Sequence, residues 1–158
     1  MEEQYLGALL KVCSRLRDIP VDWAVTGSFG MVLQGVDLPV HDIDLQTDEP
    51  GAYAIEARFP ECIVKPVTYT VSERIRSHLG ALEIGGVKVE IMGAVEKLLD
   101  DGGWEAPVQV AQFRRWVEVQ GTRVPVLSLE YEVEAYRKMG CLQRADVLER
   151  WLAERRLD

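Results

Sequence analysis

Hydrophobic positions recur along the chain with two different periods, and these predict an alternation of helices and strands. Over residues 6–16, leucines stand at helical spacing, with basic residues on much of the opposite face. This pattern predicts an amphipathic helix that ends before Pro20. Residues 21–26 are apolar and β-prone, as expected for a buried strand. They lead through Gly27-Ser28 into residues 29–34, an apolar stretch that predicts a short helix.

Further strands and helices follow. The expected strands cover 42–47, 62–70, 81–84 and 87–91, with two or three more between 108 and 126, and the expected helices cover 48–60, 128–140 and 143–156. Gly85-Gly86 favours a hairpin with a tight primed turn between two of these strands. Ser128 is the predicted cap of the helix that it precedes, because acidic residues occupy the first turn that follows. A length of 158 residues fits one domain with helices at its C-terminal end.

The composition narrows the class of protein. Acidic residues number 26 and basic residues 18, a formal net charge of -8, which argues against a protein that holds long nucleic acids or an anionic membrane surface. Cys13, Cys62 and Cys141 are far apart and lack CxxC spacing, so neither a disulfide framework nor a structural zinc site is expected. The acidic N-terminus and the lack of a long apolar run predict a cytoplasmic protein.

The first candidate for chemistry is Gly27-Ser28, between a predicted strand and a predicted helix. Such a turn leaves unpaired backbone N–H groups that attract anions, and glycine allows a phosphate to approach closely. The alternative is a plain turn in which Ser28 caps the helix.

The second candidate is a set of carboxylates on the predicted strands. Asp42 and Asp44 are two residues apart, so on a strand they project from the same face. Two like charges so close repel unless a cation lies between them, and oxygen ligands suit Mg²⁺. Glu90 has an apolar residue on each side and would join the pair if its strand is adjacent. The alternatives are two solvated acids at an exposed sheet edge, and a solvent-facing Glu90 paired with Lys88.

The ordered set of motifs resembles the nucleotidyltransferase superfamily, the fold of DNA polymerase β palm domains and of antibiotic nucleotidyltransferases. The family pattern is Gly-Ser, a gap, Asp-x-Asp with a following apolar residue, and a third carboxylate on a neighbouring strand. Here it reads Gly27-Ser28, Asp42-Ile43-Asp44-Leu45 and Glu90. Residues 127–146 also resemble the C-terminal helices of small bacterial members, the lincosamide-type and AbiEii-like branches. In those members a lysine, matched here by Lys138, often reaches the triphosphate.

The resemblance implies an α+β (α/β) nucleotidyltransferase fold with a mixed β-sheet flanked by helices. It implies one domain over 1–158, with a core at about 20–127 and C-terminal helices at about 128–156. The reaction would move a nucleoside monophosphate from an NTP to an acceptor hydroxyl and release pyrophosphate. The implied catalytic and metal-binding residues, for two Mg²⁺ or Mn²⁺ ions, are Asp42, Asp44 and Glu90, and the implied nucleotide-binding residues are Gly27, Ser28 and Lys138.

The acceptor would be a small molecule or a protein, since the acidic charge is less consistent with an RNA end. Two departures from the family pattern favour an alternative function. Arg144-Ala145-Asp146 lacks the lysine that precedes the aspartate in relatives, and the third acid is Glu rather than Asp. The alternative is a weakly active or inactive member that binds nucleotide or a partner protein, for example in a toxin–antitoxin pair. His41 is interpreted as a loop residue, and Arg114-Arg115 as an exposed pair on a strand.

Overall fold

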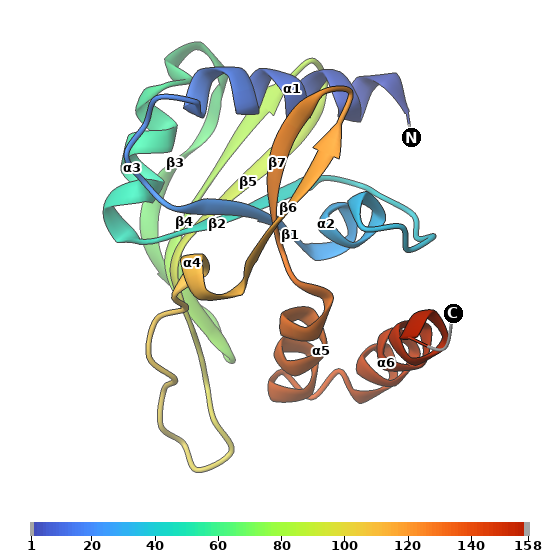
Figure 1. Ribbon diagram of the computed structural model, residues 1–158. Coiled ribbons are helices and arrows are strands. Elements are labelled where there is room, and N and C mark those ends of the chain that lie inside the picture. Colours follow the sequence, from blue (N-terminus) through green and yellow to red (C-terminus); the bar gives the residue numbers. More distant parts are fainter. Residues whose placement is uncertain (1, 157–158) are drawn as a thin grey trace.

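A computed structural model describes residues 2–156 and shows a seven-stranded mixed sheet with helices on both faces (Figure 1). The helices are α1 (Glu3–Leu16), α2 (Gly27–Leu33), α3 (Glu49–Ala57), α4 (Val110–Phe113), α5 (Leu129–Lys138) and α6 (Leu142–Arg156), with a 3₁₀ turn at Pro60–Cys62. The strands are β1 (Trp23–Thr26), β2 (Ile43–Thr47), β3 (Ile63–Val71), β4 (Ile75–Ile84), β5 (Val87–Lys97), β6 (Arg114–Val119) and β7 (Thr122–Leu127). The predicted fold class is confirmed.

The sheet order places the acid-bearing strands at its centre. The strands lie in the order β3-β4-β5-β2-β1-β7-β6. β2 pairs in parallel with β5 and antiparallel with β1, and β1 pairs in parallel with β7. Antiparallel pairs complete both ends of the sheet, β3 with β4 and β4 with β5 at one end, β6 with β7 at the other. The strand with the Asp-x-Asp pair is therefore central, and the strand of Glu90 is its direct neighbour.

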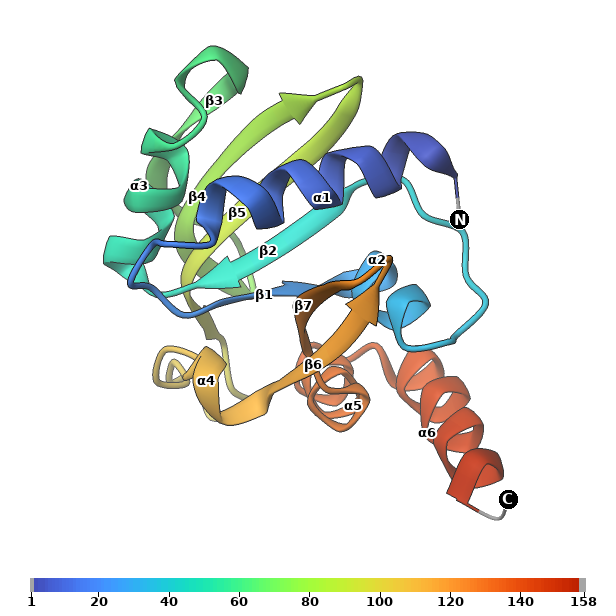
Figure 2. The same cartoon turned by 45° about the horizontal axis from the view of Figure 1, so that its top comes forward.

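One face of the sheet is covered by α1 and α3, and Figure 2 shows α1 lying across it. Leu9 of α1 and Ile55 of α3 are fully buried in the same cluster as Ile43 and Leu45 of β2. Burial of each such side chain stabilises the folded state by roughly 1.5–3 kcal/mol. The alternation of β2 thus directs Ile43 and Leu45 into this core and Asp44 to the opposite face.

The opposite face is partly covered by α5. Tyr131 and Ala135 of this helix pack with Ala24 of β1 and Val95 of β5. α6 packs beside α5 and against α2 in a separate cluster that includes the fully buried Ala145 (Figure 1). α5 therefore stands against the face of the sheet that carries the acids, and α6 packs on α5 and α2.

The local predictions hold in most places. Gly85 and Gly86 have φ values of 56° and 81°, as a two-residue primed turn requires. The flanking strands are longer than predicted, since β4 begins at Ile75 and β5 continues to Lys97. The three cysteines are free. Among the described helices, none has the length and apolar character needed to cross a bilayer.

One prediction is wrong at its start. The expected strands between 108 and 126 are a hairpin of β6 and β7, but residues 110–113 before it form the single-turn helix α4. Val110 and Phe113 stand three residues apart, so one helical turn places both on one face. There Val110 joins the buried cluster around Tyr131, and the Phe113 ring lies 5.1 Å from the Tyr131 ring.

Candidate active site

Three carboxylates converge at the centre of the sheet. Asp44 and Glu90 are direct partners in the parallel pairing of β2 with β5, and Asp42 stands just before β2. One carboxylate oxygen from each acid lies within 4.8 Å of the other two. All three side chains are half-buried. The alternative of two solvated acids at a sheet edge is therefore wrong, because β2 has a strand on both sides.

The charge of this acid cluster is poorly compensated within the protein. Burial and, to a lesser extent, the negative charges of Asp42 and Glu90 together raise the pKa of Asp44 from 3.8 to about 7. Lys88 Nζ lies 3.1 Å from a Glu90 oxygen, so the predicted Lys88 pair exists, but Glu90 also belongs to the cluster. Oxygen ligands with excess negative charge fit a divalent cation such as Mg²⁺.

The Gly27-Ser28 turn lies directly beside Asp44. Gly27 has a φ of 71°, in the left-handed region, and a Cβ at this position would lie 2.6 Å from Asp44 Oδ2. Any side chain here would therefore displace the carboxylate. α2 starts at Gly27, its N-cap is Thr26, and Ser28 is half-buried in its first turn. The alternative in which Ser28 caps this helix is not what the structure shows.

A fourth carboxylate near the turn was not singled out by the sequence motifs. Glu132 on α5 is 5% exposed and accepts hydrogen bonds from the Thr26 hydroxyl and from the Gly27 N–H, the latter over 3.2 Å. Burial raises its pKa to about 7. The sequence does contain a sign that Glu132 is buried. It lies three residues after Leu129 and one before Val133, and all three are buried residues of α5.

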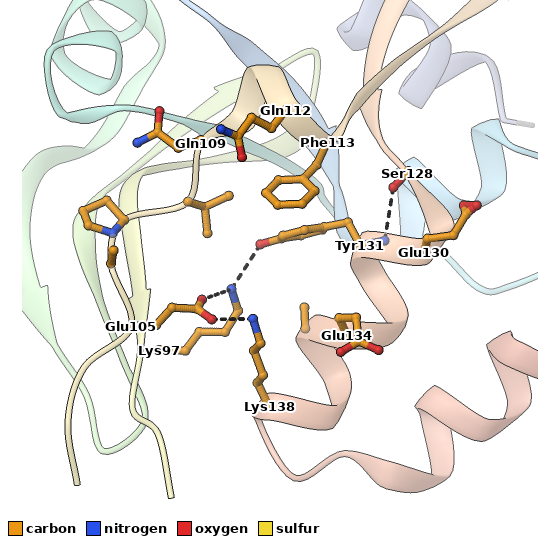
Figure 3. A pocket seen from close by; sticks show the side chains of 14 residues that line it. Lys97, Glu105, Gln109, Gln112, Phe113, Ser128, Glu130, Tyr131, Glu134 and Lys138 are labelled. Atoms are coloured by element: carbon orange, nitrogen blue, oxygen red, sulfur yellow. Dashed lines mark hydrogen bonds and ion pairs between the residues drawn. The ribbon is translucent and has the colours of Figure 1, made fainter. Parts of the chain in front are cut away.

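Lys138 stands at the other end of α5, in a different polar cluster. Its ammonium forms an ion pair with Glu105, which also lies 3.5 Å from the ammonium of the buried Lys97 (Figure 3). Lys97 in turn donates to the Tyr131 hydroxyl over 3.1 Å. Within residues 2–156, no hydrogen bond or ion pair joins Lys138 to the three central acids.

These residues line a cavity of about 420 Å³ between α5, α4 and the segment after β5. Figure 3 shows Lys97, Lys138 and Glu105 on one side of it and the Phe113 and Tyr131 rings above them. The Gln46 amide lies 3.4 Å from the Tyr131 hydroxyl. Because Gln46 follows Asp44 by two residues on the same strand, Tyr131 links the cavity wall to the acid-bearing face of β2.

His41 and the Arg114-Arg115 pair are not part of the cluster formed by the three acids. His41 is exposed in the segment before β2. Arg114 and Arg115 are on β6 at the end of the sheet, where Arg114 forms an ion pair with Asp22 over 3.2 Å and its guanidinium stacks on the Trp116 ring. Arg115 is exposed, as interpreted from the sequence, whereas Arg114 is half-buried.

Comparison with known proteins identifies several relatives. A family model described as aminoglycoside-2''-adenylyltransferase matches residues 8–150. Among solved structures, a candidate nucleotidyltransferase from Thermotoga maritima is 50% identical, with 98% of this chain and 96% of that chain covered and a TM-score of 0.86. A search of curated proteins found no match.

Two further structures share the fold at low sequence identity. The lincosamide antibiotic adenylyltransferase LnuA, solved with lincomycin bound, is 13% identical, with 94% of this chain and 98% of that chain covered and a TM-score of 0.54. The antibiotic-resistance factor ANT(2'')-Ia is 16% identical, with 99% and 95% covered and a TM-score of 0.57.

Proposed function

Because the chain belongs to the aminoglycoside-2''-adenylyltransferase family and is a nucleotidyltransferase, we propose that it moves a nucleoside monophosphate from an NTP to a hydroxyl of a small molecule, with release of pyrophosphate. The observation that carries this proposal is the convergence of Asp42, Asp44 and Glu90 beside the Gly27-Ser28 turn. ATP is the first donor to test, since the family model and the two fold neighbours are described as adenylyltransferases or resistance factors.

The three acids are the proposed holders of divalent cations, Mg²⁺ or Mn²⁺. The three carboxylates fit a divalent cation because they are close together and half-buried. Among the ion pairs of the described chain, only the one with Lys88 compensates their negative charge. Two bound ions would neutralise phosphate charge and lower the pKa of the acceptor hydroxyl. Glu90 is the acid proposed to accept the acceptor proton. Asp42 and Asp44 have the role of orienting the reacting groups.

The nucleotide phosphates are assigned to the turn and to Lys138. At Gly27 the missing Cβ leaves space that Asp44 Oδ2 occupies, and the Gly27 N–H already donates to Glu132. Ser28, half-buried in the first turn of α2, is then the donor proposed for the phosphates, through its hydroxyl and N–H. Lys138 would neutralise phosphate charge after exchanging its partner Glu105.

A small acceptor is favoured over a macromolecule. The net charge of -8 opposes a nucleic acid, and LnuA was solved with lincomycin bound. The intact set of three acids favours turnover over the alternative of an inactive binding member in a toxin–antitoxin pair.

The test is transfer of label from ATP, GTP, CTP and UTP, labelled at the α-phosphate, in the presence of Mg²⁺. Acceptors are a panel of aminoglycosides and lincosamides and a small-molecule cell extract. We expect label in an acceptor and an equal amount of pyrophosphate, both lost in Asp44→Ala and unchanged in Asp37→Ala, an exposed acid outside the site. Absence of transfer from all four nucleotides by the folded wild-type protein would refute the proposal.

A further inference from the structure

Glu132 is a buried carboxyl that the reaction proposed above does not use. It stands on α5, more than a hundred positions along the chain from the turn that it contacts, and is 5% exposed. A single oxygen, Oε1, accepts both the Thr26 hydroxyl and the Gly27 N–H. The carboxyl thereby joins the C-terminal helices to the end of β1 and the start of α2.

The two donors of Glu132 flank the acid cluster. Thr26 is the direct partner of Asp44 in the pairing of β1 with β2. Gly27 is the residue whose missing Cβ leaves space for Asp44 Oδ2. A change in the position of either donor would therefore move the backbone against which the Asp44 carboxylate rests.

Burial of a carboxyl at this place opposes folding unless its hydrogen bonds offset the loss of water. The raised pKa of Glu132 has burial as its largest cause, and the Thr26 and Gly27 hydrogen bonds lower it again. A leucine or methionine would avoid the cost of burying a carboxyl, but it would give the Thr26 hydroxyl and the Gly27 N–H no acceptor. Packing alone therefore does not account for a glutamate here.

We propose that Glu132 is a positioning residue for nucleotide binding, which holds the Gly27-Ser28 turn in its left-handed conformation against Asp44. This inference rests on the proposed function, since it assigns the turn to the phosphates. With the Gly27 N–H directed to Glu132, the turn keeps one orientation, and Ser28 stays half-buried in the first turn of α2. Loss of the acceptor releases the turn and weakens the phosphate contacts, whereas the acids themselves remain in place.

The experiment compares Glu132→Ala, which removes the acceptor, with Glu132→Gln, which keeps a carbonyl oxygen of the same reach. Glu118→Gln, an exposed acid on β6, is the matched control. Binding of the α,β-methylene analogues of ATP, GTP, CTP and UTP is measured with Mg²⁺ by titration calorimetry, so no acceptor is needed. Steady-state transfer then gives KM and kcat separately.

We expect Glu132→Ala to weaken analogue binding and raise the nucleotide KM by roughly tenfold or more, as for loss of a hydrogen-bonded charged partner. The kcat at saturating nucleotide should change much less. Glu132→Gln should bind within about threefold of wild type, since its oxygen replaces Oε1. A purely structural role predicts a lower melting temperature with an unchanged KM.

The outcomes separate this proposal from the proposed function. Wild-type binding in a folded Glu132→Ala variant would overturn the positioning role and leave nucleotidyl transfer intact. Failure of wild type to bind any of the four analogues would overturn both. If Glu132→Ala does not fold, Thr26→Val removes one of the two donors and leaves Gly27 bonded. A severalfold loss of binding is then expected, and unchanged binding would overturn the positioning role.

Discussion

Replacement of Asp44 by asparagine is expected to stabilise the protein in EDTA at alkaline pH, although the same change abolishes the proposed activity. The physical reason is the burial of this carboxyl next to Asp42 and Glu90, which raises its pKa from 3.8 to about 7. Asparagine has nearly the same shape and no charge. It therefore removes the electrostatic cost and leaves the sheet pairing of β2 intact.

The sign and size follow from proton linkage. Because the folded pKa is raised above the unfolded value, the stabilising effect of the neutral carboxyl is full below pH 3.8 and is lost as the pH rises through about 7. At about 1.4 kcal/mol per pKa unit, the wild type loses up to about 4 kcal/mol over this interval through Asp44. The difference between Asp44→Asn and wild type should grow from near zero at pH 4 to between about 2 and 4 kcal/mol at pH 8.

Magnesium should also stabilise the wild type, because a bound cation compensates the negative charge that the substitution removes. For a dissociation constant of ~1 mM, addition of 10 mM Mg²⁺ stabilises the folded wild type by about 1.4 kcal/mol. The stabilisation should be much smaller in Asp44→Asn, since the ion loses a charged ligand.

The assay is urea unfolding followed by tryptophan fluorescence at pH 4, 6 and 8, with EDTA or Mg²⁺. Asp37→Asn, an exposed acid, is the control and should follow the wild type at every pH. The reasoning is refuted if Asp44→Asn is less stable than wild type at pH 8 in EDTA, or if the difference does not change with pH. Equal stabilisation of both proteins by Mg²⁺ would show that the ion binds elsewhere.

Three further substitutions test separate parts of the site. Gly27→Ala should destabilise the protein by roughly 2–4 kcal/mol and abolish transfer, because φ is positive and the new Cβ meets Asp44. Gly121→Ala is the control, since φ is 79° there but the space around it is open. It should lower the free energy of unfolding in urea by only about 1 kcal/mol and leave transfer unchanged. Lys138→Ala should raise the nucleotide KM roughly tenfold in the transfer assay but change stability by less than about 1 kcal/mol, since its ion pair is exposed. Ser128→Ala removes the side-chain cap of α5 and should cost about 1 kcal/mol in urea unfolding.

The central acids could be predicted from the sequence because their placement depends on local alternation. Asp42 and Asp44 follow a period of two, so the buried Ile43 and Leu45 determine which face the acids take. Glu90 needed one long-range assumption, that its strand neighbours β2, and the family resemblance supplied it; the parallel register confirms it.

The segment 108–113 shows where local pattern was insufficient. It contains Val108, Val110 and Phe113, which suit a strand by composition. The single helical turn is favoured because it lets Phe113 pack against the Tyr131 ring on α5. That contact joins positions far apart in the chain, so tertiary packing overrides the propensity of six residues.

Lys138 illustrates the same limit at the level of function. The motif assigns this lysine to the triphosphate. The structure shows it at the surface, where it and the buried Lys97 both pair with Glu105. Glu105 carries one negative charge between the ammonium groups of Lys97 and Lys138, so these three side chains together have one excess positive charge. The motif and the structure agree if a phosphate replaces Glu105 as the partner of Lys138 while Glu105 keeps its ion pair with Lys97. The buried lysine then explains how the exchange leaves no buried charge without a partner.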